Sequence, residues 1–236
     1  MAVSAVTTYT LSLNELIAEA FDIIGVGSEG ETISADMYDR AKRSLNLMIL
    51  TLNAEEDLWR RETRVVTLLD GVAAYALASP KPMRVEAARR KLTLGGYETP
   101  MTMWSRQEYL DQPNKTNSPS TPVNFYYDPQ RDTGTLFVWP APSAAVSTAN
   151  TVQLDILRPM FVMDSSANTL DFPQEWQETV VYNLATRLMA KYPVNDGSLA
   201  NLVIAQATAL MTKLKAWDNE QASIYLQPDD RWHSWR

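Results

Sequence analysis

The sequence contains no cysteine and a single histidine, His233, in 236 residues. Without cysteine there are no disulfides, thiolate nucleophiles or Cys-ligated metal sites, and one histidine leaves no His pair for zinc. No apolar run approaches the roughly 20 residues that a membrane span needs, and residues 1–10 lack the charged and apolar blocks of a signal peptide. We therefore expect a protein made in a cytoplasm, with no cofactor, no metal and no membrane partner.

Positive charge is also scarce. The formal net charge is -7 and the sequence pI is about 4.8. Because neutralising phosphates requires clustered lysine and arginine, this balance argues against a surface that grips nucleic acid. The composition, 45% hydrophobic and 21% charged, is that of an ordinary globular protein with room for a sizeable core.

Helical patterns occupy both ends of the chain. Ser12 and Glu15 have capping-box spacing, and Phe172-Pro173 followed by glutamates is typical of a helix start. Ser198 is a candidate N-cap for the last helix. Apolar residues at three- and four-residue spacing then predict helices at about 12–24, 34–56, 173–192 and 198–218.

The middle of the chain, about 59–161, has the pattern of short strands. Asp70-Gly71 predicts a hairpin between residues 62–69 and 74–77, and Gly95-Gly96 predicts a second one between residues 83–94 and 97–103. Three more strands are expected at 123–127, 135–139 and 152–158. The predicted fold is therefore α+β: a helical bundle from both chain ends, an inserted antiparallel β-rich module, and an extended C-terminal tail. We expect residues 1–220 to form one cooperative body.

No catalytic site is visible. Adjacent carboxylates at Glu55-Glu56-Asp57 point in different directions on a helix end, so we interpret them as solvated surface. Several arginines lie close together in the β-rich part, and in an acidic protein such residues pair with carboxylates within the fold or across a subunit contact. The candidates for inter-subunit ion pairs are Arg60, Arg61, Arg64, Arg89 and Arg90.

Residues 221–236 have the composition of a partner-binding tail. Pro228 blocks continuation of the last helix. Disordered tails are depleted in aromatic residues, whereas this segment combines them with arginine, the mixture that dominates binding hot spots. The predicted binding residues are Tyr225, Leu226, Arg231, Trp232, Trp235 and Arg236.

Two neighbouring stretches carry a resemblance to a known family. Residues 119–130, Pro-Ser-Thr-Pro-Val-Asn-Phe-Tyr-Tyr-Asp-Pro-Gln, and residues 134–142, Gly-Thr-Leu-Phe-Val-Trp-Pro-Ala-Pro, are similar to the central signature of the head-to-tail adaptors of short-tailed phages, also called packaged-DNA stabilisation or tail accessory proteins. Further pieces in matching order cover most of the chain: Arg43 to Met48 with Leu58-Trp59, Arg158-Pro159, Asp171 to Trp176, Asp218 to Glu220, and Pro228-Asp229.

The resemblance implies a structural virion protein rather than an enzyme, located at the head–tail junction and assembled in the host cytoplasm. Such a protein forms a ring, a dodecamer in the family, beneath the portal protein; it extends the DNA channel and presents a platform for a tail or nozzle protein. DNA would pass through without sequence-specific binding, and the tail at 221–236 would contact the portal or a neighbouring subunit. Two alternatives stay open: a peptidoglycan hydrolase, which needs two opposed carboxylates in a cleft, and an acidic DNA-associated binding module.

Overall fold

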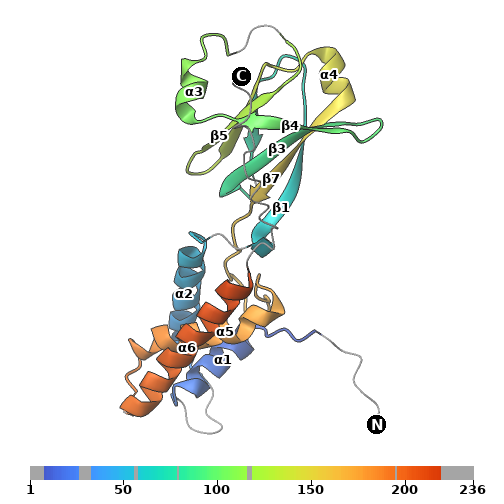
Figure 1. Cartoon of the computed structure of the whole chain (residues 1–236). Coiled ribbons are helices and arrows are strands. Elements are labelled where there is room, and N and C mark those ends of the chain that lie inside the picture. The colour runs from blue at the N-terminus through green and yellow to red at the C-terminus, as the bar shows by residue number, and fades with distance from the viewer. Residues whose placement is uncertain are drawn as a thin grey trace, which may run out of the picture.

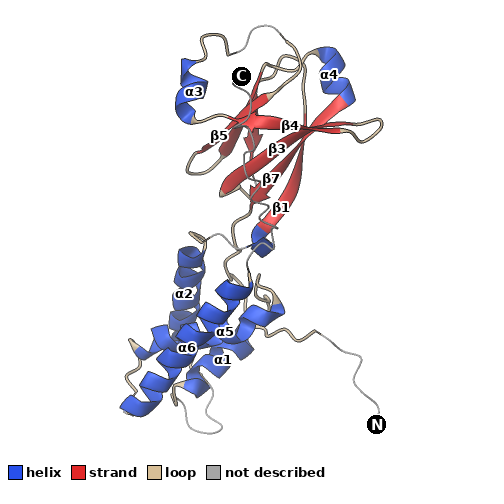
Figure 2. Cartoon of the chain, viewed as in Figure 1, coloured by secondary structure: helices blue, strands red, loops and turns tan. Residues whose placement is uncertain are grey.

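The computed structural model describes residues 8–26, 33–55, 58–78, 80–115, 119–194 and 196–218. It consists of two units arranged end to end, a helical bundle and a β-rich unit (Figure 1). The bundle is built from α1 (Leu13–Ile23), α2 (Ala35–Leu52), α5 (Gln177–Met189) and α6 (Gly197–Trp217). Helices therefore come from both ends of the chain and strands from its middle, as Figure 2 shows by colour. The predicted α+β class is confirmed.

Local sequence signals start the helices. The Ser12 hydroxyl accepts from the Glu15 backbone N–H, while a Glu15 carboxylate oxygen accepts from the Ser12 N–H at 2.8 Å, which is the predicted capping box. At α6 the predicted N-cap was two residues too late. Asp196, rather than Ser198, is the N-cap, and its carboxylate accepts from the Ser198 N–H at 2.8 Å. Asp is as good an N-cap as Ser, and Ser198 falls inside the first turn.

Helix α5 is central to the bundle and is preceded by a short 3₁₀ turn, η2 (Gln174–Trp176). It packs against α1, α2 and α6, whereas contacts between α1 and α2 are few. Its apolar stripe meets those of its neighbours in a core that buries about twenty hydrophobic side chains, with Trp176 the largest. Prominent among them are Leu16, Phe21, Leu45, Ile49, Val181 and Leu184.

The β-rich unit is one seven-stranded sheet in the order β1-β7-β3-β4-β5-β6-β2. Every neighbouring pair is antiparallel except β4 and β5, which are parallel over a short stretch. The sheet encloses a second core that includes Val66, Phe125, Leu136, Val152, Leu154 and Ile156. The elements of this unit are η1 (Leu58–Arg60), β1 (Arg61–Thr67), β2 (Ala74–Leu77), β3 (Arg84–Leu92), β4 (Glu98–Met103), α3 (Arg106–Asp111), β5 (Asn124–Pro129), β6 (Gly134–Trp139), α4 (Ala144–Ala149) and β7 (Asn150–Leu157).

One predicted hairpin is present and the other is wrong. β3 and β4 pair around a turn in which Gly95 and Gly96 both have positive φ, as the two-glycine signal required. β1 and β2 do not pair. They lie at opposite ends of the strand order, β1 against β7 and β2 against β6, because each finds a partner that buries its inward side chains.

The chain crosses between the two units twice, at residues 53–61 and again at 157–173. Because the two cores are separate clusters, these crossings hold the units together. Cooperative unfolding of residues 1–220 stays a prediction, and the tail at 221–236 lies outside the described residues. None of the described helices is long and apolar enough to span a membrane.

Candidate functional site

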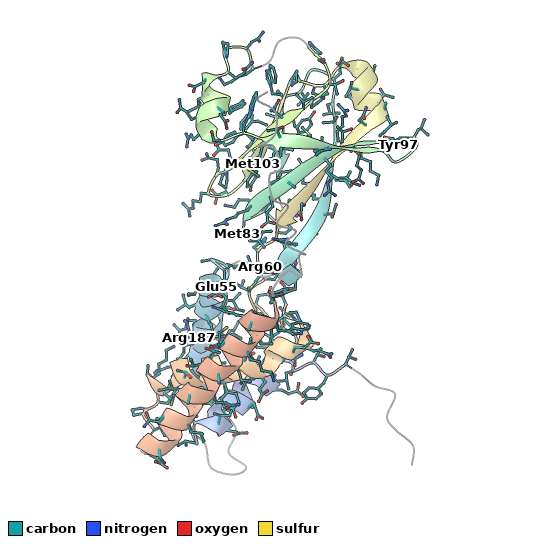
Figure 3. The ribbon with its side chains drawn as sticks, in the orientation of Figure 1. Glu55, Arg60, Met83, Tyr97, Met103 and Arg187 are labelled. Carbon is teal, nitrogen blue, oxygen red and sulfur yellow. The ribbon has the colours of Figure 1, made fainter. Side chains whose placement is uncertain are left out.

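Arg60 sits at the joint between the units, as labelled in Figure 3. Its side chain is 0% exposed. The guanidinium donates to the carbonyl oxygens of Glu55 at 2.6 Å, Asn53 at 3.3 Å and Arg158 at 3.1 Å. A further hydrogen bond goes to the Asn53 amide oxygen at 3.2 Å. A cation here complements the negative end of the α2 dipole and satisfies carbonyls that the helix leaves without partners.

The second crossing is held by an ion pair. Arg158 binds Asp171 through both guanidinium nitrogens, at 2.6 and 3.0 Å, with both side chains mostly buried. The guanidinium also lies over the indole of Trp59, 5.4 Å from its ring centroid. Trp59 in turn packs against Trp176 of the bundle, with the ring centroids 6.2 Å apart. The bidentate ion pair and the aromatic packing both require a specific geometry, so together they fix the orientation of the chain at this joint.

Two amide side chains each donate to a backbone carbonyl and accept from a backbone N–H, as a paired strand does. Asn46 of α2 exchanges two hydrogen bonds with the backbone of Met163, at 2.8 and 2.9 Å. Gln177 of α5 accepts from the Leu11 N–H at 2.9 Å and donates to the Tyr9 carbonyl at 2.8 Å. Each amide fixes an extended segment on the bundle without a partner strand.

The five predicted arginines do not form one cluster. Arg60 is buried inside the joint and in this conformation has no surface to offer a neighbouring subunit. Arg61 pairs with Glu86 at 3.1 Å and Arg89 with Glu98 at 3.7 Å, while Arg64 and Arg90 donate to the carbonyl oxygens of Pro80 and Pro122. The contacts of Arg61 and Arg89 are the within-fold pairing with carboxylates that the sequence left open as one of two outcomes. Inter-subunit pairing stays a proposal for the four arginines other than Arg60.

The predicted tail residues Tyr225, Leu226, Arg231, Trp232, Trp235 and Arg236 all lie outside the described residues. So do Glu56 and Asp57 of the acidic run. Glu55 is described, and its carboxylate pairs with Lys215 of α6 at 2.7 Å. This pair places the end of α6 beside the joint.

Large apolar side chains are exposed on two helices of the bundle. Leu47 and Leu50 project from α2, and Leu202 and Ile204 from α6, where Leu202 is 65% exposed. Trp217 at the end of α6 is 71% exposed. Helix α6 contributes only Val203 and Ala207 as buried residues, so most of its surface is free to pack against something else. Exposed apolar surface of this kind marks interaction sites.

A groove of about 780 Å³ runs between α1 and α5. Leu11, Ile23, Val181 and Tyr182 supply apolar surface, and three exposed glutamates stand around it: Glu19, Glu175 and Glu178. The side chains of all three are exposed to solvent. Within the described part of the chain no group of three or more potential ligands is placed to hold a metal.

Comparison with known proteins supplies the identity. The family model described as SU10 adaptor protein matches residues 11–231. The chain belongs to the SU10 adaptor protein family. The resemblance to phage head-to-tail adaptors is thereby confirmed, and this adaptor is a structural protein of the virion head–tail junction.

Two other comparisons add less. No curated protein matches the adaptor. Among solved structures that match is one described as "Neck of empty GTA particle computed with C6 symmetry", which is 16% identical, with 94% of this chain and 96% of that chain covered and a TM-score of 0.31. The family match, rather than that likeness, supports the function proposed below.

Proposed function

We propose that this adaptor assembles into a closed ring beneath the portal, extends the DNA channel and presents a platform for a tail or nozzle protein. Family membership supports the head–tail role. The observation that supports ring formation is the bundle's unpartnered apolar surface on two different helices, α2 and α6. Identical head-to-tail contacts need two different patches on every copy, and a ring is the arrangement in which they close.

Helix α6 of one copy, in this proposal, packs against the bundle of the next. Leu202 and Ile204 are exposed on opposite flanks of the buried Val203, while Lys213 and Lys215, the charged residues of this 21-residue helix, lie in its second half. Burying one such leucine or isoleucine contributes about 1.5–3 kcal/mol. Even one such side chain per contact, repeated around the ring, is a useful part of a subunit interface.

The test is assembly of a charged variant. Leu202→Asp with Ile204→Asp removes the apolar contact whichever flank of α6 meets the neighbour and places a charge there, so no ring should form on the portal by electron microscopy or native mass spectrometry. Leu94→Asp is the matched control, because Leu94 is also an exposed leucine, at 84%, but lies at the β3–β4 turn away from the bundle. Rings of normal size from the α6 double variant would refute this interface.

We also propose that the channel wall of the ring is acidic. A charge of -7 per subunit is multiplied in the assembly, and carboxylates facing the lumen let DNA slide without a grip. In the β-rich unit Arg61 and Arg89 are already engaged by Glu86 and Glu98. A structure of the ring with a predominantly basic lumen would contradict this proposal.

The tail at residues 221–236 is proposed as the attachment segment, binding the portal or a neighbouring subunit. It follows in sequence after α6, whose described end lies beside the joint, and its aromatic and arginine residues are those of binding hot spots. Deleting residues 221–236 should leave the helical circular dichroism signal intact and abolish attachment to the portal. Unchanged attachment by the deletion variant would refute it.

A further inference from the structure

The groove between α1 and α5 has the character of a receptor for a short aromatic and basic peptide. Its volume, about 780 Å³, lies in the range of pockets that hold a ligand of a few side chains. Val181 and Tyr182 give it an apolar base on α5, and Ile23 extends that base on α1. The described residues that line it include Glu19, Glu175 and Glu178 and no lysine or arginine.

One wall of the groove is preformed. The extended residues Thr8 to Leu11 run along it and are fixed by Gln177, which is 6% exposed and bonds both the Tyr9 carbonyl and the Leu11 N–H. The Tyr9 N–H also donates to the Gln174 side chain at 3.4 Å. Because this wall is held by a buried amide, a ligand would not have to order it on binding.

The sequence contains a segment that matches this surface. Residues 231–236 read Arg-Trp-His-Ser-Trp-Arg, which places two indoles between two guanidinium groups and includes no carboxylate side chain. We propose that residues 231–236 of one copy bind the α1–α5 groove of an adjacent copy, with Trp232 and Trp235 on its apolar base and the arginines against its glutamates. This proposal rests on the ring proposed above and names the receptor for its tail.

The arrangement of the bundle favours an adjacent copy over the same one. α1 and α6 both pack on α5, yet they make few contacts with each other, so they lie on different sides of it. The pair between Lys215 and Glu55 directs the end of α6 toward α2 and the joint (Figure 3). The end of α6 and the groove therefore lie on different sides of α5 in one copy, which favours the groove of an adjacent copy as the receptor.

Binding is tested with a fluorescent peptide of residues 228–236 and the full chain carrying Trp232→Ala and Trp235→Ala, so that the chain's own segment does not compete. Fluorescence anisotropy should give a saturable curve. Replacing Glu19, Glu175 and Glu178 by glutamine in that background should weaken binding about tenfold, since it removes the partners of two arginines. A peptide with both tryptophans changed to alanine should bind at least about thirtyfold more weakly.

The matched control removes three carboxylates elsewhere. Glu62→Gln, Asp70→Asn and Asp132→Asn produce the same change in net charge at exposed positions of the β-rich unit, so peptide binding should be unchanged. An absence of saturable binding, or an equal loss in the groove variant and the control, would overturn the proposal.

The choice between copies is tested separately. A photo-crosslinking amino acid at position 235 of the full chain is activated in a mixture of ¹⁵N-labelled and unlabelled protein with portal, and the crosslinked peptides are identified by mass. Crosslinks that join labelled to unlabelled chains at residues 174–182 support binding of the segment in the groove of an adjacent copy. Crosslinks within one copy, or to the portal, would refute it. Peptide binding without any ring by native mass spectrometry would show that the ring had failed and the groove had not.

Discussion

Arg60 should be the most costly single side chain to remove outside the two cores. Its guanidinium, fully buried, bonds the carbonyls of Asn53 and Glu55 on one side of the joint and that of Arg158 on the other. In Arg60→Met the aliphatic volume is largely kept, but these buried acceptors lose a charged donor. A buried acceptor left unsatisfied costs about 1–3 kcal/mol, and because several acceptors share this one donor, the total loss should be about 3–5 kcal/mol.

That loss is a large part of a typical domain stability of about 5–15 kcal/mol. With a urea dependence of about 2–3 kcal/mol per molar, the midpoint of unfolding should fall by roughly 1–2 M. Arg60→Lys should recover little of it, since one ammonium cannot span acceptors that the planar guanidinium reaches from three nitrogens. Urea unfolding followed by far-UV circular dichroism measures both variants.

The neighbouring arginine is the control. Arg61 has partial exposure and pairs with Glu86 on the surface of the sheet, so Arg61→Met should cost less than about 1 kcal/mol. Calorimetry adds a second readout. The wild-type chain should unfold in one transition, whereas Arg60→Met should separate the bundle from the sheet into two. Equal losses for the two variants, with a single transition in both, would refute the account of the joint.

Three further outcomes follow from local geometry. Gly134→Ala should destabilise the sheet by about 1–3 kcal/mol in urea unfolding, because its new Cβ would lie 2.1 Å from the Tyr127 hydroxyl, whereas Gly197→Ala, with no atom within 4 Å, should be neutral. Burial raises the pKa of Tyr127 to about 12. Wild type should therefore lose stability relative to Tyr127→Phe as the pH rises from about 10 to 12. Parallel curves of unfolding free energy against pH for the two proteins would contradict this. Hydrogen bonds from Ser12 lower the pKa of Glu15. Wild type should therefore exceed Glu15→Gln in unfolding free energy by its full amount above about pH 5, and this difference should disappear as the pH falls through the folded-state pKa. A difference that does not change with pH would contradict this.

The helices and one hairpin were predictable because their signals are local. Ser12 and Glu15 specify a helix start within four residues, and Gly95-Gly96 specifies a turn whatever surrounds it. The strand order was not predictable, since β1 and β7 are separated by more than eighty residues and pair through register rather than through a turn. Adjacent strands in sequence therefore suggested a β1–β2 hairpin that the sheet does not contain.

Neither the joint nor the groove could be predicted from the sequence, for related reasons. Arg60 and Arg61 are chemically alike and adjacent, and only the distant Arg158 carbonyl and the end of α2 distinguish the buried one. Gln177 gives no signal of its binding role, because its partners lie about 165 residues earlier in the chain. A polar residue on the predicted buried stripe of a helix is the one hint that the sequence offered.

The paired crossings have a mechanical consequence. Both tethers between the units continue into neighbouring antiparallel strands, and Arg61, the first residue of β1, lies directly opposite Leu157, the last residue of β7. β1 runs away from the bundle and β7 runs back toward it, both roughly along the long axis of the molecule (Figure 1). Tension along that axis therefore pulls two strands at once in the direction of their length. Because β1 pairs with β7 alone and both strands are pulled the same way, the load falls as shear on the ladder of β7 with β3, where many hydrogen bonds must yield together, instead of peeling one strand away bond by bond.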